Sequence, residues 1–157
     1  MLTLGLQYIT LDASLKTVVC DIEADGLTNP TKVHCIVCKC VESGELTIFR
    51  RLTDGLQEEA DRFKEYAEGV EQWVGHNILG YDVPVVDYLL DYHIPVDRCI
   101  DTYIISKLVN YSRPGGHSVE QYGEEFGTPK GKNHYLDFFK NWTQEMEDYC
   151  VRDVEIS

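Results

Sequence analysis

Basic residues are scarce in this sequence. It has 14 lysines and arginines against 27 aspartates and glutamates, which gives a formal net charge of −13 at pH 7. Taken alone, this deficit argues against a protein that holds nucleic acid through a broad basic surface. A solvated acidic surface accounts for most of the excess carboxylates, and a bound divalent cation is a second reason to keep some of them.

Long apolar runs are also missing. No stretch approaches the roughly 20 apolar residues of a membrane-spanning helix, and the first ten residues lack the charged leader and apolar core of a secretory signal. There is no repeat and no low-complexity linker, while 43% of the 157 residues are hydrophobic, as in ordinary globular proteins. We therefore expect a tail over residues 1–15, one domain over residues 16–157, and no membrane association.

The sequence lacks a convincing zinc motif, although it has six cysteines. Cys35 and Cys38 form a C-x-x-C pair with Cys40 close by, but a structural zinc site usually needs two ligand pairs placed on turns. Residues 32–41 have the pattern of a strand instead. We expect the cysteines to be reduced and mostly buried.

The order of the predicted elements indicates a mixed sheet. Strands are predicted over residues 16–23, 31–41, 45–51 and 72–75, with a short one near residue 100. Helices are predicted from a capping pair at Asp54 and Gln57 to residue 68, over residues 82–92, up to residue 108, over residues 118–126, and from a cap at Thr143 to the chain end. Three strands in a meander followed by alternating strands and helices predict an α/β fold whose central mixed sheet is flanked by helices.

Asp21 and Glu23 form the first candidate site. They lie at the end of the first predicted strand, and alternation puts both carboxylates on one face, opposite Val18, Cys20 and Ile22. Two adjacent carboxylates repel each other, and a divalent cation between them would remove that cost. A polar face on an edge strand is the alternative interpretation.

Asp82 and the pair Tyr149 and Asp153 add to this pattern. Asp82 stands at a loop-to-helix junction, where aspartate is also an ordinary cap. Tyr149 and Asp153 are four residues apart and share a helix face, where a simple surface pair is the competing interpretation. Together the motifs supply four carboxylates and a tyrosine. Hard oxygen ligands suit Mg²⁺ or Mn²⁺, and two such ions are a known arrangement for phosphodiester cleavage.

These motifs resemble those of a known family. The order Asp-x-Glu, Asp, Tyr-x₃-Asp is similar to that of the DEDD-type (DnaQ-like) 3′–5′ exonucleases, which have an RNase H-like fold. Tyrosine four residues before the last aspartate marks the tyrosine subclass, and Asp148 excludes the histidine subclass. The chain looks most like the proofreading domain of bacteriophage family A DNA polymerases. The resemblance covers residues 16–157 and rests on residues 21–24, 32–35, 76–77, 81–84, 99–102, 116–117 and 148–154.

The resemblance implies a role for each motif residue. Asp21, Glu23 and Asp153 would hold one metal ion, Asp21 would bridge to the second, and Asp82 would bind that second ion through water. Tyr149 and Glu23 would orient the attacking water. Further roles implied are Leu27 as a wedge against the terminal bases, Asn77 as a contact to the terminal nucleotides, Asp101 as a supporting residue, and His117 as a helix-capping or packing residue.

The implied function is metal-dependent removal of nucleotides from the 3′ end of single-stranded DNA. Two ions, Mg²⁺ or Mn²⁺, would be the cofactors, a DNA polymerase domain or subunit a possible partner, and the cytoplasm of a phage-infected or bacterial cell the location. Residues 130–134 and 113–116 are the loops best suited to meet phosphate. Two alternatives remain: an exoribonuclease of the same superfamily, and a non-catalytic docking module on the same fold.

Overall fold

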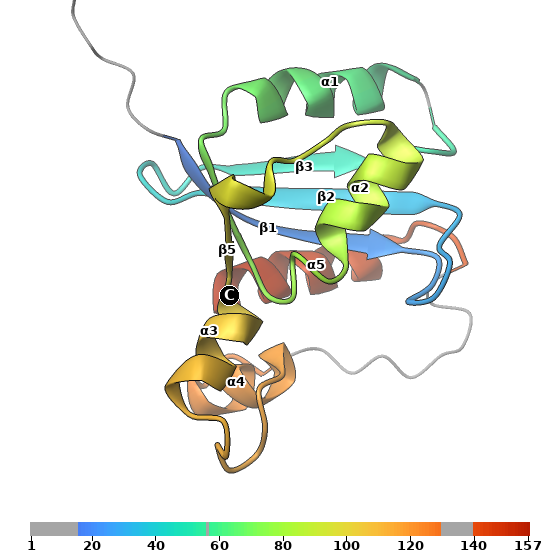
Figure 1. The fold of residues 1–157 in the computed structure, drawn as a ribbon. Coiled ribbons are helices and arrows are strands. Elements are labelled where there is room, and N and C mark those ends of the chain that lie inside the picture. The colour runs from blue at the N-terminus through green and yellow to red at the C-terminus, as the bar shows by residue number, and fades with distance from the viewer. Residues whose placement is uncertain (1–15, 56, 130–139) are drawn as a thin grey trace, which may run out of the picture.

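The computed structural model describes residues 16–55, 57–129 and 140–157, and its centre is a five-stranded sheet (Figure 1). The strand order is β3-β2-β1-β4-β5, so the first strand of the chain is the middle one. The predicted tail, residues 1–15, lies outside the described residues. Within the described part of the chain, no helix is long and apolar enough to cross a membrane.

The sheet is mixed, as predicted. β1, β2 and β3 form an antiparallel meander, while β4 and β5 continue the sheet on the other side of β1 in parallel. The strands are β1 (Thr17–Ala24), β2 (Val33–Cys40), β3 (Leu46–Arg50), β4 (Gln72–Gly75) and β5 (Cys99–Asp101). β4 therefore lies beside the first half of β1, where Thr17, Val18 and Val19 pair with residues 55 positions later in the sequence.

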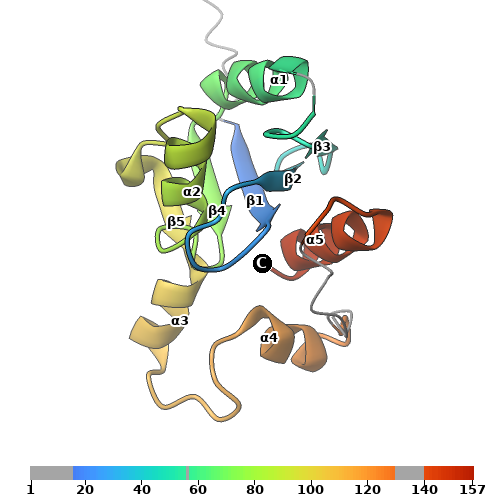
Figure 2. The same ribbon diagram turned by 90° about the vertical axis from the view of Figure 1, so that its right-hand side faces the viewer.

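Helices cover both faces of the sheet, with α1 and α2 on one face and α5 on the other (Figures 1 and 2). α3 and α4 extend beyond the end of the sheet near the end of α5. The helices are α1 (Gln57–Glu68), α2 (Asp82–Leu90), α3 (Thr102–Val109), α4 (Val119–Glu125) and α5 (Gln144–Ile156), with a single 3-10 turn, Val96–Arg98, before β5.

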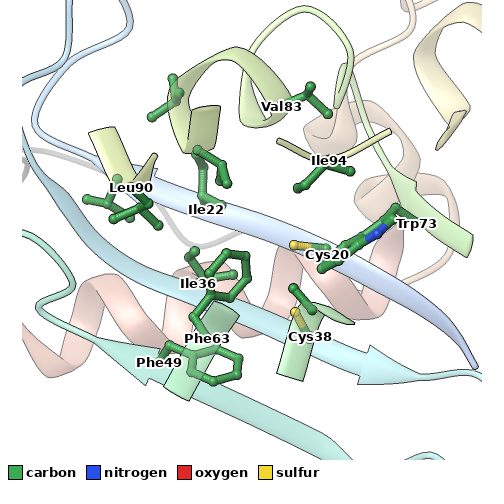
Figure 3. Close-up of a cluster of buried hydrophobic side chains, with 14 of the residues drawn as sticks. Cys20, Ile22, Ile36, Cys38, Phe49, Phe63, Trp73, Val83, Leu90 and Ile94 are labelled. Atoms are coloured by element: carbon green, nitrogen blue, oxygen red, sulfur yellow. The ribbon is translucent and has the colours of Figure 1, made fainter. Parts of the chain in front are cut away.

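The larger core lies between the sheet and the helices α1 and α2. Figure 3 shows Cys20 and Ile22 of β1 meeting Phe63 of α1 and Val83 of α2, with Trp73 of β4 at one side. All five side chains are at least nine-tenths buried. Burial of this apolar surface stabilises β1 as the central strand, which fixes the backbone position of the acidic residues on its opposite face.

A smaller core lies between the sheet and α5. Cys150 and Val154 of α5 pack against Cys35 and Val37 of β2. The hydroxyl of Thr143 accepts a hydrogen bond from the Met146 backbone N–H, which confirms the predicted cap. The Thr143 cap stabilises the start of α5, and Cys150 and Val154 pack this helix against the sheet.

The predicted capping pair at Asp54 and Gln57 is wrong. α1 begins at Gln57, two residues later than an N-cap at Asp54 requires, and the Gln57 side-chain amide donates to Asp61 instead. Asp54 lies in a turn and its carboxylate is 3.9 Å from the Arg51 guanidinium. A capping motif read from spacing alone cannot distinguish a helix start from the turn before it.

The C-x-x-C pair is not a metal site. Cys35 packs in the α5 core and Cys38 in the core under α1, so their thiols lie on opposite faces of β2. This follows from strand alternation, since residues three apart point in opposite directions. The six cysteines are free, and the four at positions 20, 35, 38 and 150 are buried, as expected.

Candidate metal centre

β1 presents Asp21 and Glu23 to α5, on the face opposite the larger core. Ligand atoms of the two carboxylates and of the Cys150 thiol lie within 4.8 Å of one another. The Cys150 thiol donates to the Asp21 carboxylate at 3.3 Å and to the Asp21 backbone carbonyl at 3.4 Å. Because β1 is the central strand, the polar-edge interpretation of this pair is wrong.

α5 completes one wall of a hollow of about 310 Å³ over the end of β1. Glu23 and Asp153 are 7% and 4% exposed, so both carboxylates are nearly desolvated. The surface-pair interpretation of Asp153 is therefore wrong as well. The hollow brings together residues from β1, its following loop, the N-cap of α2 and α5, namely Asp21, Ile22, Glu23, Ala24, Gly26, Leu27, Tyr81, Tyr149 and Asp153.

Asp82 is buried beside this hollow at the start of α2. Its side chain is 4% exposed, and Asp82 is the first residue of the helix, because Tyr81 occupies the N-cap position. Among the described residues, Oδ1 of Asp82 has no hydrogen-bond partner. Burial and then the charge of Asp21 raise the pKa of the Asp82 carboxyl well above its usual value, although the N–H groups of Asp82 and Ile22 act in the opposite direction.

The loop after β1 forms the rim of the hollow and exposes Leu27. The Asp25 carboxylate accepts hydrogen bonds from the backbone N–H groups of Thr31 and Lys32, which closes the loop. The Tyr81 hydroxyl donates to the Gly26 carbonyl at 2.7 Å and so ties this rim to the segment before Asp82. Leu27 is 87% exposed, so its side chain projects from the rim of the hollow.

Asn77 and His117 also lie outside the hollow. Asn77 is exposed on the loop between β4 and α2, five positions before Asp82. His117 is structural, as expected, because its ring contacts the Ser106 hydroxyl at 2.6 Å and the Tyr111 carbonyl at 3.2 Å.

Two loops were predicted to meet phosphate, and the structure describes one of them, residues 113–116. Arg113 donates to the Gly116 carbonyl and the Glu125 carboxylate, and its guanidinium stacks over the Tyr122 ring. Because these contacts within the α3–α4 region already engage the guanidinium, Arg113 is poorly placed to bind phosphate. The other loop, residues 130–134, lies outside the described residues.

Sequence reasoning missed the roles of Tyr81 and Cys150. Among the sequence-based predictions, Tyr81 appears only within a segment of the family resemblance, and Cys150 only among the cysteines expected to be reduced and mostly buried. Burial and then the charge of Asp82 raise the pKa of Tyr81 to about 12, so its hydroxyl stays protonated and can donate to Gly26. The position of Cys150, three residues before Asp153 on the packed face, was the available signal.

The donor set fits hard divalent cations. Carboxylate oxygens are the ligands that Mg²⁺ and Mn²⁺ prefer. Burial of Asp82 and then the nearby charge of Asp21 disfavour its ionised carboxylate, and a bound cation would offset this cost and give the buried Oδ1 a partner. The residues that could hold ions are Asp21, Glu23 and Asp153, with Asp82 beside them.

The chain belongs to the RNase H superfamily, because residues 18–154 match that family. No curated protein matches by sequence. This assignment agrees with the mixed sheet, and it confirms the predicted RNase H-like fold.

Solved structures share the fold at low identity. The family B DNA polymerase of the hyperthermophilic archaeon Pyrobaculum calidifontis matches 90% of this chain over 23% of its own, at 15% identity and a TM-score of 0.65. Phi29 DNA polymerase, solved with primer-template DNA, matches 90% of this chain over 30% of its own, at 16% identity and a TM-score of 0.53. The chain thus spans less than a third of these polymerases.

Proposed function

We propose that this chain is a metal-dependent 3′–5′ exonuclease of the DEDD type, tyrosine subclass, which removes nucleoside 5′-monophosphates from single-stranded DNA. The observation that carries the proposal is the convergence of Asp21, Glu23 and Asp153 on one hollow, with Tyr149 in its wall and Asp82 buried beside it. Membership of the RNase H superfamily and the DNA polymerases among the structures that share the fold support a substrate of this class.

The carboxylates would hold two divalent ions. Asp21, Glu23 and Asp153 would ligate one ion, and Asp21 with Asp82 would hold the second. When bound, such ions lower the pKa of water and stabilise the charge of the leaving oxygen. The protein contributes by fixing the ligands on β1, α2 and α5, three elements that the two cores hold in place.

The remaining residues of the hollow position water and substrate. Tyr149 and Glu23 face the same space and would orient the attacking water, with Glu23 accepting a hydrogen bond and Tyr149 adding its hydroxyl. Leu27 would separate the terminal bases, since an exposed apolar side chain on the rim can insert between stacked rings. Asn77, on the neighbouring loop, would contact the terminal nucleotides.

The acidic surface sets a limit on affinity. With a net charge of −13, the chain has little electrostatic attraction for phosphate beyond that of the bound ions. A DNA polymerase domain or subunit would supply local concentration of the 3′ end.

The experiment that tests the substrate is a competition between two single strands of one sequence, DNA and RNA, labelled with different dyes at the 5′ end and mixed with Mn²⁺. We expect the DNA to shorten faster. Faster shortening of the RNA would favour the exoribonuclease alternative, and no shortening of either strand would favour the docking module.

Metal binding should stabilise the fold, since the ligands come from positions 21 to 153 and meet only in the folded state. At a hundred times its dissociation constant, Mn²⁺ adds about 2.7 kcal/mol, or about 5–10 °C in melting temperature for a domain of this size. In Asp82→Asn the metal-induced shift should be smaller, because a ligand and its charge are lost. Thermal melts with and without Mn²⁺, at constant ionic strength, check both expectations.

Without metal, Asp82→Asn should melt at a higher temperature than the unchanged protein at neutral pH. A carboxyl whose folded pKa is raised costs stability as pH rises from its unfolded pKa, about 3.9, to the folded value. The advantage of Asn should therefore disappear below about pH 3.9. Asp87→Asn, an exposed change on the same helix, is the control. Mn²⁺ shifts that are equal in all three proteins and no larger than the shift given by a control salt at the same ionic strength would contradict a metal site.

A further inference from the structure

Asp101 is a further buried carboxylate near the site, and its surroundings differ from those of the proposed ligands. It is 5% exposed, at the end of β5 and directly before α3. Four backbone N–H groups surround it. Oδ1 accepts from Asn77 at 3.0 Å, Tyr103 at 3.0 Å and Ile104 at 3.3 Å, and Oδ2 accepts from Leu79 at 3.1 Å.

Two of the four hydrogen bonds to Asp101 are not part of a helix cap. Bonds to Tyr103 and Ile104 are those of an ordinary N-cap aspartate. The bonds to Asn77 and Leu79 reach 24 and 22 residues back, into the loop between β4 and α2. Asp101 thus joins the start of α3 to the loop that carries Asn77 and leads into Asp82.

The loop conformation needs such a tether. Asn77 has a φ of 61°, in the left-handed region that is unfavourable for most residues and tolerated by asparagine. The Asn77 side chain lies close against Gly80. A Cβ added at Gly80 would be only 2.5 Å from the Asn77 Oδ1, so the loop leaves no room for a side chain there. Charge-assisted hydrogen bonds to a buried carboxylate can hold a strained backbone in one conformation.

A second contact strengthens the same junction. The His76 ring lies 3.0 Å from the Thr102 hydroxyl, which also contacts the Gly75 carbonyl at 3.4 Å. Gly75 and Asp101 are register partners in the parallel pair β4–β5. The His76–Thr102 contact and the β4–β5 pairing therefore hold the residues next to the Asp101 hydrogen bonds. Together these contacts fix the first half of the loop that carries Asn77.

We propose that Asp101 is a positioning residue for the DNA substrate and acts through Asn77. The inference rests on the proposed function, since it assigns Asn77 to the terminal nucleotides. A ligand role for Asp101 is disfavoured, because both oxygens already accept backbone hydrogen bonds that a metal would have to replace. Asp101 therefore controls where Asn77 meets the strand and leaves the metal ligands in place.

A double-mutant cycle tests this coupling. Asp101→Asn keeps the size of the side chain but replaces one acceptor oxygen by a donor, which frees at least one loop N–H. We expect Asp101→Asn and Asn77→Ala each to raise KM for a single-stranded oligonucleotide about tenfold, with kcat changed less than about threefold. The double variant should also show a rise of about tenfold, because both changes remove the same contact.

Independent effects of Asp101→Asn and Asn77→Ala on KM would overturn the proposal. A rise in KM of about a hundredfold in the double variant, or a loss of kcat with KM unchanged, would show that Asp101 does not act through Asn77. Ser118→Ala removes the α4 cap without touching the loop, and Asp97→Asn makes the same charge change at an exposed site. Both controls should keep the KM of the unchanged protein.

Amide hydrogen exchange tests the tether without any activity. The Asn77 and Leu79 amides should exchange faster in Asp101→Asn than in the unchanged protein, while amides of β1 keep their rates. If the unchanged protein hydrolyses no DNA, the proposed function fails and the exchange rates still decide on the tether. Unchanged rates at Asn77 and Leu79 in a folded Asp101→Asn protein would contradict the tether itself.

Discussion

Asp21→Asn and Asp153→Asn should each lower the rate of DNA hydrolysis about a thousandfold or more, which corresponds to about 4 kcal/mol of transition-state stabilisation. Both carboxylates face the hollow and would ligate the ion that activates water. The fold should survive. Asparagine has nearly the size of aspartate, and removing one of several close carboxylates reduces repulsion. The measurement is the initial rate of shortening of a single-stranded oligonucleotide in Mn²⁺.

A matched control variant distinguishes the loss of any carboxylate charge from the loss of a metal ligand. Glu155→Gln removes a carboxylate on α5 two residues beyond Asp153, where Glu155 pairs with Lys39 at the surface. Its rate should stay within about twofold of the unchanged protein, since exposed ion pairs contribute little. An Asp21→Asn or Asp153→Asn protein that is folded and retains more than a few per cent of the rate would refute the assigned ligands.

Tyr149→Phe should slow the chemical step about ten- to a hundredfold while KM and Mn²⁺ affinity stay nearly constant. The ring remains in the wall of the hollow, and only the hydroxyl that would orient water is lost. Single-turnover rates under saturating metal isolate the chemical step, and calorimetric titration with Mn²⁺ measures the affinity.

Tyr88→Phe is the control for Tyr149→Phe. Tyr88 is 79% exposed on α2, so loss of its hydroxyl should change neither rate nor affinity. If Tyr149→Phe has the single-turnover rate of Tyr88→Phe, the Tyr149 ring only packs against its neighbours and plays no part in orienting water.

Much of the fold could be predicted because its signals are local. Strand alternation placed Val18, Cys20 and Ile22 in the core and put Asp21 and Glu23 on the other face, as the structure confirms. The predicted ends of β1, β2 and β3 differ from the observed ones by one or two residues. The capping pair before α1 failed because its spacing also fits a turn.

The parts of the site that could not be predicted depend on contacts between distant segments. Nothing in the sequence near Asp101 shows that its carboxylate accepts N–H groups 22 and 24 residues earlier in the chain. The bond from Tyr81 to Gly26 spans 55 residues, and the one from Cys150 to Asp21 spans 129. Such pairs arise only when the sheet brings β1, β4 and α5 together, so they require a structure.

The measurement that tests the central claim most directly is the product ladder from a 5′-labelled single-stranded DNA of defined sequence. With Mn²⁺ the protein should shorten the strand one nucleotide at a time from its 3′ end and release nucleoside 5′-monophosphates, and EDTA should stop the reaction. Asp153→Asn, prepared in the same way, should leave the strand intact. Internal cuts, shortening that continues in EDTA, or equal ladders from both proteins would contradict a carboxylate-held metal centre acting on the 3′ end.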